Sequence, residues 1–234
     1  MRRKRSGKLL LEVCVDSVES AIAAQKGGAG RIELCANIAS GGITPSAGMI
    51  TAVRTCLSVG LHVMIRPRGG DFCYSPAEFS VMQRDIIAAK KFGADGVVFG
   101  ILNSSGSVDV GRTRSLANLA HPLSVTFHRA FDAATDPLQA LEEIISIGIN
   151  RILTSGQAAT AVKGVGLIGK LIRQAGPRII IMPGSGVTEK NVQSIIGRAA
   201  VSEIHSYTGV SRKVRGTVTA DAIKVRRFIA AMNE

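Results

Sequence analysis

One pattern repeats along the chain: a short apolar run rich in β-branched residues, a loop, an amphipathic stretch that ends near glycine, and then another apolar run. Short apolar runs bounded by turn residues are typical of buried strands, and the amphipathic stretches between them are typical of helices. The pattern predicts eight strands, each followed by a helix: residues 9–15, 31–35, 61–66, 96–100, 123–128, 151–154, 178–182 and 202–205.

Several of the predicted helices begin at capping residues. Ser75 is followed by a proline and lies three residues before Glu78, which predicts a capping box. Asp136 is also followed by a proline, and Asp16 with Glu19 predicts a further capping box. Glycines, which tolerate a left-handed backbone, mark the ends of three helices: Gly28, Gly93 and Gly148.

Strands that alternate with helices predict a parallel sheet. Eight such units in 234 residues fit a single-domain α/β protein, a (β/α)₈ TIM barrel, a fold of about 200 to 250 residues or more. The alternative is an open doubly wound sheet, but its usual glycine-rich turn is missing after the first strand. No proline- or serine-rich linker divides the chain. We therefore expect residues 1–7 to form a basic flexible tail and residues 8–234 a barrel domain.

The chain has 29 basic and 17 acidic residues, a formal net charge of +12, which first suggests a nucleic-acid or membrane partner. The charge is local, however, because five basic residues lie in residues 1–8 and six in residues 208–227. An aromatic content of 4% argues against a stacking platform for single strands. No apolar run approaches the roughly 18 residues of a membrane span. The composition therefore argues against both partners.

Two of the four cysteines lie in matched tripeptides of the first two strands, Glu12-Val13-Cys14 and Glu33-Leu34-Cys35. We recognise no signal peptide, so we expect a cytoplasmic, reducing setting in which the cysteines are free thiols. The cysteines form no CxxC pair, which excludes a zinc ribbon or a thioredoxin motif. If the two strands are neighbours in like register, the sulfurs approach each other and suit Cu(I), which favours sulfur ligands. The alternative is that Cys14 and Cys35 are small buried apolar residues.

Polar residues also follow most of the predicted strands at their C-terminal ends, where barrels carry their active sites. A barrel enzyme acting on a small anionic or phosphorylated metabolite is therefore the alternative function. His128 would act as acid or base, and Asp132 would set its tautomer. Arg66 and Arg68 form a cationic corner suited to a carboxylate or phosphate, unless they pair with a glutamate of the first two strands.

A glycine-rich turn, Gly184-Ser185-Gly186, follows the seventh strand. Barrels often bind phosphate through the backbone of the loops after strands seven and eight, so this turn is a candidate anion site. Arg129 and His205, which follow the fifth strand and end the eighth, are further candidates for binding the anion. The alternative for the turn is a tight connection without a ligand.

Five stretches of the sequence resemble the CutC copper-homeostasis family: LEVCVDSVES at 11–20, RIELC at 31–35, IRPRGGDF at 65–72, TFHRAFD at 126–132 and LTSG at 153–156. The resemblance implies a (β/α)₈ barrel, a cytoplasmic and sometimes nuclear setting, and assembly into homodimers or homotetramers. It also implies a role in copper homeostasis, with Cys14 and Cys35 matching the cysteines proposed as Cu(I) ligands in the animal members. No reaction comes with the resemblance, so it leaves open whether the protein is an enzyme.

Overall fold

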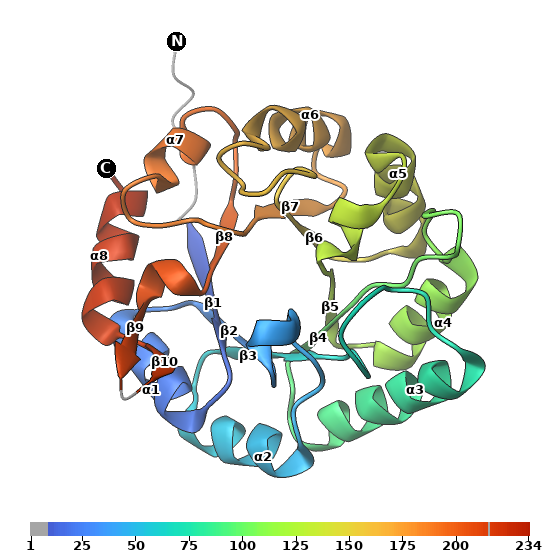
Figure 1. Ribbon diagram of the computed structural model, residues 1–234, viewed down its shortest axis with the longest axis horizontal. Helices are drawn as coiled ribbons and strands as arrows, with labels where there is room; N and C mark the ends of the chain where they lie inside the picture. Colours follow the sequence, from blue (N-terminus) through green and yellow to red (C-terminus); the bar gives the residue numbers. More distant parts are fainter. Residues whose placement is uncertain (1–8, 215) are drawn as a thin grey trace.

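A computed structural model describes residues 9–214 and 216–234, so the predicted tail at residues 1–7 lies outside the described residues. Eight strands form a ring that eight helices surround (Figure 1). The strands are β1 Leu10–Val15, β2 Arg31–Leu34, β3 Gly60–Met64, β4 Gly96–Phe99, β5 Ser124–Phe127, β6 Arg151–Thr154, β7 Ile180–Pro183 and β8 Glu203–Ser206. All eight predicted strands are present, with ends that differ by one or two residues at most.

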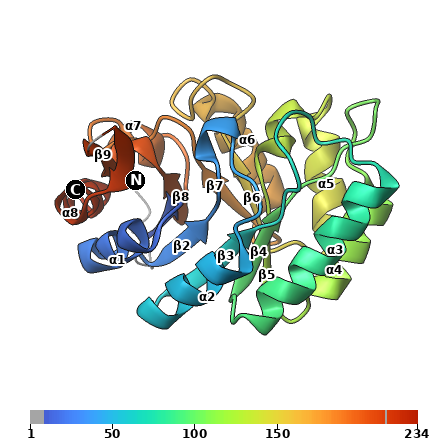
Figure 2. The same cartoon turned by 60° about the horizontal axis from the view of Figure 1, so that its bottom comes forward.

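Each strand is followed by one helix, and the helices run along the outside of the strands (Figure 2). The helices are α1 Val18–Gly27, α2 Ala47–Cys56, α3 Pro76–Lys91, α4 Val110–Ala120, α5 Pro137–Ile147, α6 Val165–Ala175, α7 Val192–Ile196 and α8 Ala222–Met232. Within the described ranges, none of them is long and apolar enough to cross a membrane.

The sheet has the strand order β7-β6-β5-β4-β3-β2-β1-β8, and every paired neighbour is parallel. Chain order is therefore followed around the ring, and β7 and β8 lie next to each other where it closes (Figure 1). This topology confirms the predicted (β/α)₈ barrel. It excludes the doubly wound alternative, whose strand order reverses direction partway through the chain.

The predicted helix caps are largely confirmed. Ser75 and Glu78 form the capping box of α3, and the carboxylate of Asp136 accepts two backbone hydrogen bonds at the start of α5. The cap of α1 is Ser17 instead of the predicted Asp16, because the helix begins one residue later and the Ser17 hydroxyl accepts the backbone hydrogen bond. The three helix-ending glycines all have positive φ: Gly28, Gly93 and Gly148.

The two faces of the barrel strands carry different chemistry. Outward side chains such as Val13, Ile32 and Val63 are apolar and pack in the main core between strands and helices. Alternate residues point to the opposite face, into the barrel. Much of that inner face is charged or polar, and its buried members include Glu12, Arg31, Glu33, His62, Arg151, Glu203 and His205.

Paired charges fill the part of the barrel near the N-terminal ends of the strands. The Arg31 guanidinium donates to the carboxylates of Glu12 and Glu203, and Arg151 Nε lies 3.0 Å from Glu203 Oε2. Burial acts to raise the pKa of Glu12, but the positive charge of Arg31 holds it well below its ordinary value. We call these four residues the ion network. It closes this end of the barrel with mutually compensated charges.

A short antiparallel hairpin, β9 Ser211–Val214 and β10 Thr217–Ala220, lies between β8 and α8. The sequence pattern predicts only a loop here, because the hairpin is short and polar and adds no apolar run. Arg212 in the hairpin pairs with Asp221 at 3.0 Å, which gives this basic segment an internal partner.

Replacement of Arg31 by methionine should strongly destabilise the fold. The change leaves two buried carboxylates without their shared cation, and breaking a buried ion pair in this way costs about 3–5 kcal/mol. Urea unfolding measures the loss. The matched control is Arg178→Met, which removes an exposed arginine paired with Glu142 at 2.6 Å and should change stability far less. An equally small effect of both substitutions would show that the ion network does not hold the barrel together.

Candidate metal centre and the cavity above it

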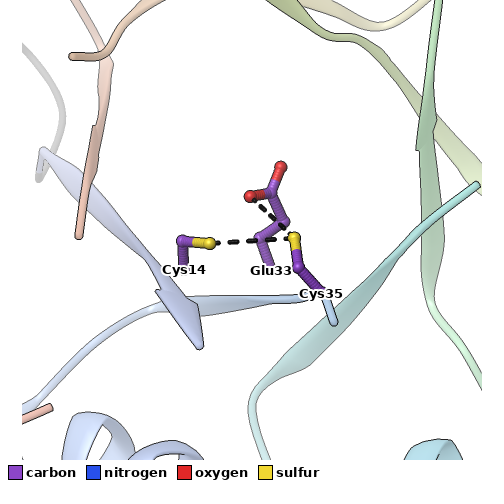
Figure 3. Close-up of side chains that lie close together, drawn as sticks. All are labelled: Cys14, Glu33 and Cys35. Carbon is purple, nitrogen blue, oxygen red and sulfur yellow. Dashed lines mark hydrogen bonds between the residues drawn. The ribbon is translucent and has the colours of Figure 1, made fainter. Parts of the chain in front are cut away.

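Two cysteine side chains meet inside the barrel (Figure 3). Cys14 Sγ lies 3.7 Å from Cys35 Sγ, and Cys35 Sγ lies 3.5 Å from Glu33 Oε2. Cys14 is 6% exposed and Cys35 is 1% exposed. The three side chains supply ligand atoms that all lie within 4.8 Å of one another, which is close enough to share one metal ion.

The sulfurs meet although the two tripeptides are not in like register. Cys14 is opposite Glu33 in the β1–β2 ladder, so the second tripeptide is shifted along the barrel by two residues. A shift of two residues leaves each side chain on the same face of the sheet, because alternate residues of a strand share a face. Cys14, Glu33 and Cys35 therefore all point inward. The two sulfurs approach each other as predicted, but with Cys14 opposite Glu33 and not opposite Cys35.

Soft and polar groups surround the two thiols on different sides. Met64 and Val98 pack with both cysteines in a small apolar cluster inside the barrel. His205 Nδ1 lies 2.8 Å from Glu12 Oε1, and His205 Nε2 lies 3.8 Å from Glu33 Oε2. His205 therefore connects the ion network to the carboxyl group beside the thiols.

Neighbouring groups shift the pKa values of the two thiols in opposite directions. The hydrogen bond between the two thiols lowers the pKa of Cys14 to about 6, although burial acts in the opposite direction. The same contact, together with burial, raises the pKa of Cys35 well above its ordinary value. Burial and the nearby Cys14 sulfur also raise the pKa of Glu33. At neutral pH the Cys14 thiolate therefore lies beside the Cys35 thiol, and the surroundings of Glu33 shift its carboxyl group toward the protonated form.

The thiols lie at the bottom of a cavity of about 710 Å³. This cavity brings together most of the residues that the sequence singles out: Cys14, Cys35, Arg66, His128, Arg129, Asp132, Ser185, Gly186 and His205. It does not include Arg68 or Gly184. The residues come from the C-terminal ends of the strands and the loops beyond them, which is the face on which barrel enzymes and binding proteins form their sites.

Arg66 and Arg68 do not act as one corner. Arg68 is directed away from the cavity, with Nε 2.6 Å from Glu78 Oε1 and Nη2 3.0 Å from Asp71 Oδ1. Arg66 is buried and donates to the backbone carbonyls of Ser40, Gly42 and Gly70. Neither arginine pairs with a glutamate of the first two strands, because Glu12 is held by Arg31 and Glu33 lies beside Cys35.

Asp132 organises loops and does not contact His128. Its carboxylate accepts hydrogen bonds from Arg129 Nε, from the side chains of Thr154 and Ser155, and from backbone N–H groups after β6. His128 Nδ1 instead accepts from the Ala130 N–H at 3.1 Å. The prediction that Asp132 sets the tautomer of His128 is therefore wrong. The backbone N–H of Ala130 sets it instead.

The turn after β7 contains two successive left-handed residues, Ser185 with φ 79° and Gly186 with φ 67°. Gly184 precedes them and packs closely, since a Cβ there would lie 2.5 Å from Leu153 Cδ1 and 3.3 Å from His205 Cβ. Close packing therefore explains why position 184 is a glycine. The Ser185 hydroxyl donates to the Ala159 carbonyl, which ties the turn to the loop after β6.

Glu33 and Phe72 are among the cavity residues that receive no functional role from the sequence alone. The alternation of strand residues was sufficient to find Glu33, because it lies two positions before Cys35 and so shares its face. Phe72 carries no such signal. It follows a glycine-rich loop, and only the folded chain brings it against Arg66 and His128.

These features define a class of protein, a single-domain (β/α)₈ barrel with a buried pair of thiols under the cavity at its C-terminal face. The model of the CutC family matches residues 9–210, and the chain belongs to that family.

The similarity extends over most of the chain in several relatives. A mouse "copper homeostasis protein cutC homolog" is 51% identical over 203 residues, covering 87% of this chain and 75% of the relative. A "family protein CutC" from Bacteroides thetaiotaomicron is 53% identical over 226 residues, covering 92% of this chain and 91% of the relative. The solved CutC structure from Streptococcus agalactiae is 34% identical, with a TM-score of 0.81 over 84% of this chain and 97% of that one.

More distant structures share only the fold. Thiamine phosphate pyrophosphorylase from Pyrococcus furiosus has a TM-score of 0.64 at 16% identity, over 97% of this chain and 98% of that one.

Acid should destabilise the protein partly through His128. Burial and the charge of Arg66 lower the pKa of His128 to about 3, whereas an unfolded histidine titrates near 6.5. As pH falls from 6.5 to 4.5, the unfolded state takes up a proton that the folded state does not, and stability falls by up to about 1.4 kcal/mol per pH unit. Denaturant unfolding at both pH values measures this loss, which should be smaller in His128→Phe. An NMR titration of the His128 ring near pH 6.5 would contradict the assignment.

Proposed function

We propose that this protein is a copper-homeostasis protein that binds one Cu(I) ion through the thiolates of Cys14 and Cys35. The observation that carries the proposal is the 3.7 Å distance between two buried sulfurs at the base of an open cavity. Sulfur is the ligand that Cu(I) prefers, and metal binding requires deprotonated thiols. The lowered pKa of Cys14 supports the proposal, because one thiolate is already present at neutral pH.

The spacing of the sulfurs fits a single ion with a third ligand. With bonds of roughly 2.3 Å, as in zinc thiolates, two sulfurs at this separation enclose an angle of about 107° at the metal. Such an angle suits three or four ligands better than a linear pair. The thioether of Met64, which packs against both cysteines, is a soft candidate for the third position, and Glu33 is a harder one.

The surroundings favour capture of the ion from one direction. The ion network fills the opposite end of the barrel, so the cavity at the C-terminal face is the route by which copper reaches the thiols. The small exposure of both cysteines keeps water away from the bound ion. A reducing setting such as the cytoplasm keeps the thiols free, and the family resemblance favours a homodimer or homotetramer there.

The catalytic alternative has weaker support from the same geometry. His128 Nδ1 is occupied by a backbone N–H, and Asp132 is occupied by loop contacts. The two residues therefore do not form the histidine–aspartate pair that the sequence suggested. Copper binding needs no such pair.

Titration of the reduced protein with Cu(I) against a competing chelator should give one tightly bound ion per chain. Cys14→Ser combined with Cys35→Ser should weaken binding by more than about 100-fold, because loss of even the residues around metal ligands costs 10- to 100-fold. The matched control is Cys56→Ser with Cys73→Ser, which removes the two exposed cysteines and should leave binding unchanged. Equal copper retention by both double variants would refute the assignment.

A further inference from the structure

Arg66 is a buried cation without an acidic partner. It is 4% exposed, and among the described residues no carboxylate lies within ion-pair distance of it. A guanidinium has five N–H donors, and the three backbone carbonyls that it contacts accept three of them. Its Nε is buried and has no hydrogen-bond partner among the residues that the structure describes. A buried unpaired charge is costly, so an anion at this position has a clear physical advantage.

His128 presents a second unused donor beside Arg66. Because its Nδ1 accepts from the Ala130 N–H, the neutral ring carries its proton on Nε2. Nε2 is buried and accepts or donates no hydrogen bond within residues 9–214 and 216–234, and the side chain is 4% exposed. The charge of Arg66 is one of the causes that keep this ring neutral, which agrees with the two groups lying close together.

Phe72 covers both groups. The Arg66 Cζ lies 4.9 Å from the centre of the Phe72 ring, and the His128 ring centre lies 5.0 Å from it. Phe72, Arg66 and His128 all line the same cavity, and Phe72 is only partly buried. A displacement of this one side chain therefore opens both unused donors to the cavity.

We propose that Arg66 and His128 form a binding site for the carboxylate group of a small organic anion, in the cavity above the thiols and beneath Phe72. The planar edge of an arginine and an adjacent N–H donor match the two oxygens of a carboxylate. The whole cavity of about 710 Å³ is far larger than a metal ion needs and accommodates a small molecule. The proposal does not depend on copper, because neither residue belongs to the sulfur cluster.

Isothermal titration calorimetry of the copper-free, reduced protein with succinate tests the proposal, with neutral succinamide as the isosteric control. Succinate should bind, and succinamide should bind at least tenfold more weakly, because hydrogen bonds to a charged acceptor are the stronger ones. Inorganic phosphate in a third titration distinguishes a carboxylate site from a general anion site. Absence of succinate binding, or tighter binding of phosphate, would overturn the proposal.

Substitutions locate the site. Arg66→Gln should weaken succinate binding at least tenfold, whereas Arg178→Gln, which removes an equal charge from an exposed ion pair, should leave it unchanged. If Arg66→Gln does not fold, His128→Phe removes the second donor while keeping a ring against Phe72, and it should also weaken binding at least tenfold. Retained affinity in a folded variant of either residue would place the anion elsewhere.

The anion site is distinguishable from the copper site by one further variant. Cys14→Ser with Cys35→Ser should bind succinate as the wild type does while losing copper. Phe72→Ala should accelerate succinate association, measured by stopped flow, because the covering ring no longer has to move. Loss of succinate binding in the serine variant would mean that the thiols, and not Arg66 and His128, hold the anion.

Discussion

The barrel depends on the compensation of charges that its own strands bury. Each strand is covered on both faces, so inward-pointing Glu12, Arg31 and Glu203 have no water to solvate them. An unpaired charge in such a place is far more costly than a paired one. The ion pairs of Arg31 with two carboxylates are therefore the interactions that stabilise the interior. They also decide where a ligand can enter, because the paired charges fill one end of the barrel and leave the other end open.

The ion network and the thiols form one connected system. Glu12 binds Arg31 on one side and His205 on the other, and His205 reaches toward Glu33, which contacts Cys35. The carboxylates of Glu33 and Glu12 raise the pKa of His205 well above its ordinary value, although burial acts to lower it. The nearby carboxylates thus favour the protonated form of the His205 imidazole, which lies close to the thiols. The charge that the network holds is in this way part of the environment that favours a thiolate.

The cavity has two chemically different walls. The wall from β1 and β2 carries soft sulfur, and the wall at the ends of β3 and β5 carries Arg66 and His128. The turn Gly41–Gly42 separates them: a Cβ on Gly42 would lie 3.2 Å from Cys35 Sγ, and one on Gly41 would lie 2.9 Å from Arg66 Nη1. Both residues also have positive φ, which favours glycine, and this one turn packs against both walls. A soft metal and an organic anion can therefore occupy neighbouring parts of one cavity.

The sequence by itself determined the eight strands, most helix caps and the barrel, because these follow from periodicity and from local capping chemistry. It also placed Cys14 and Cys35 in matched tripeptides of the first two strands, and only the folded barrel showed that both side chains point inward. The sequence did not decide the two-residue register shift, the outward turn of Arg68 or the engagement of Asp132 by the loop after β6. Those depend on contacts between segments far apart in the chain. Side-chain direction, unlike strand identity, is chosen by the partners that only the closed barrel brings within reach.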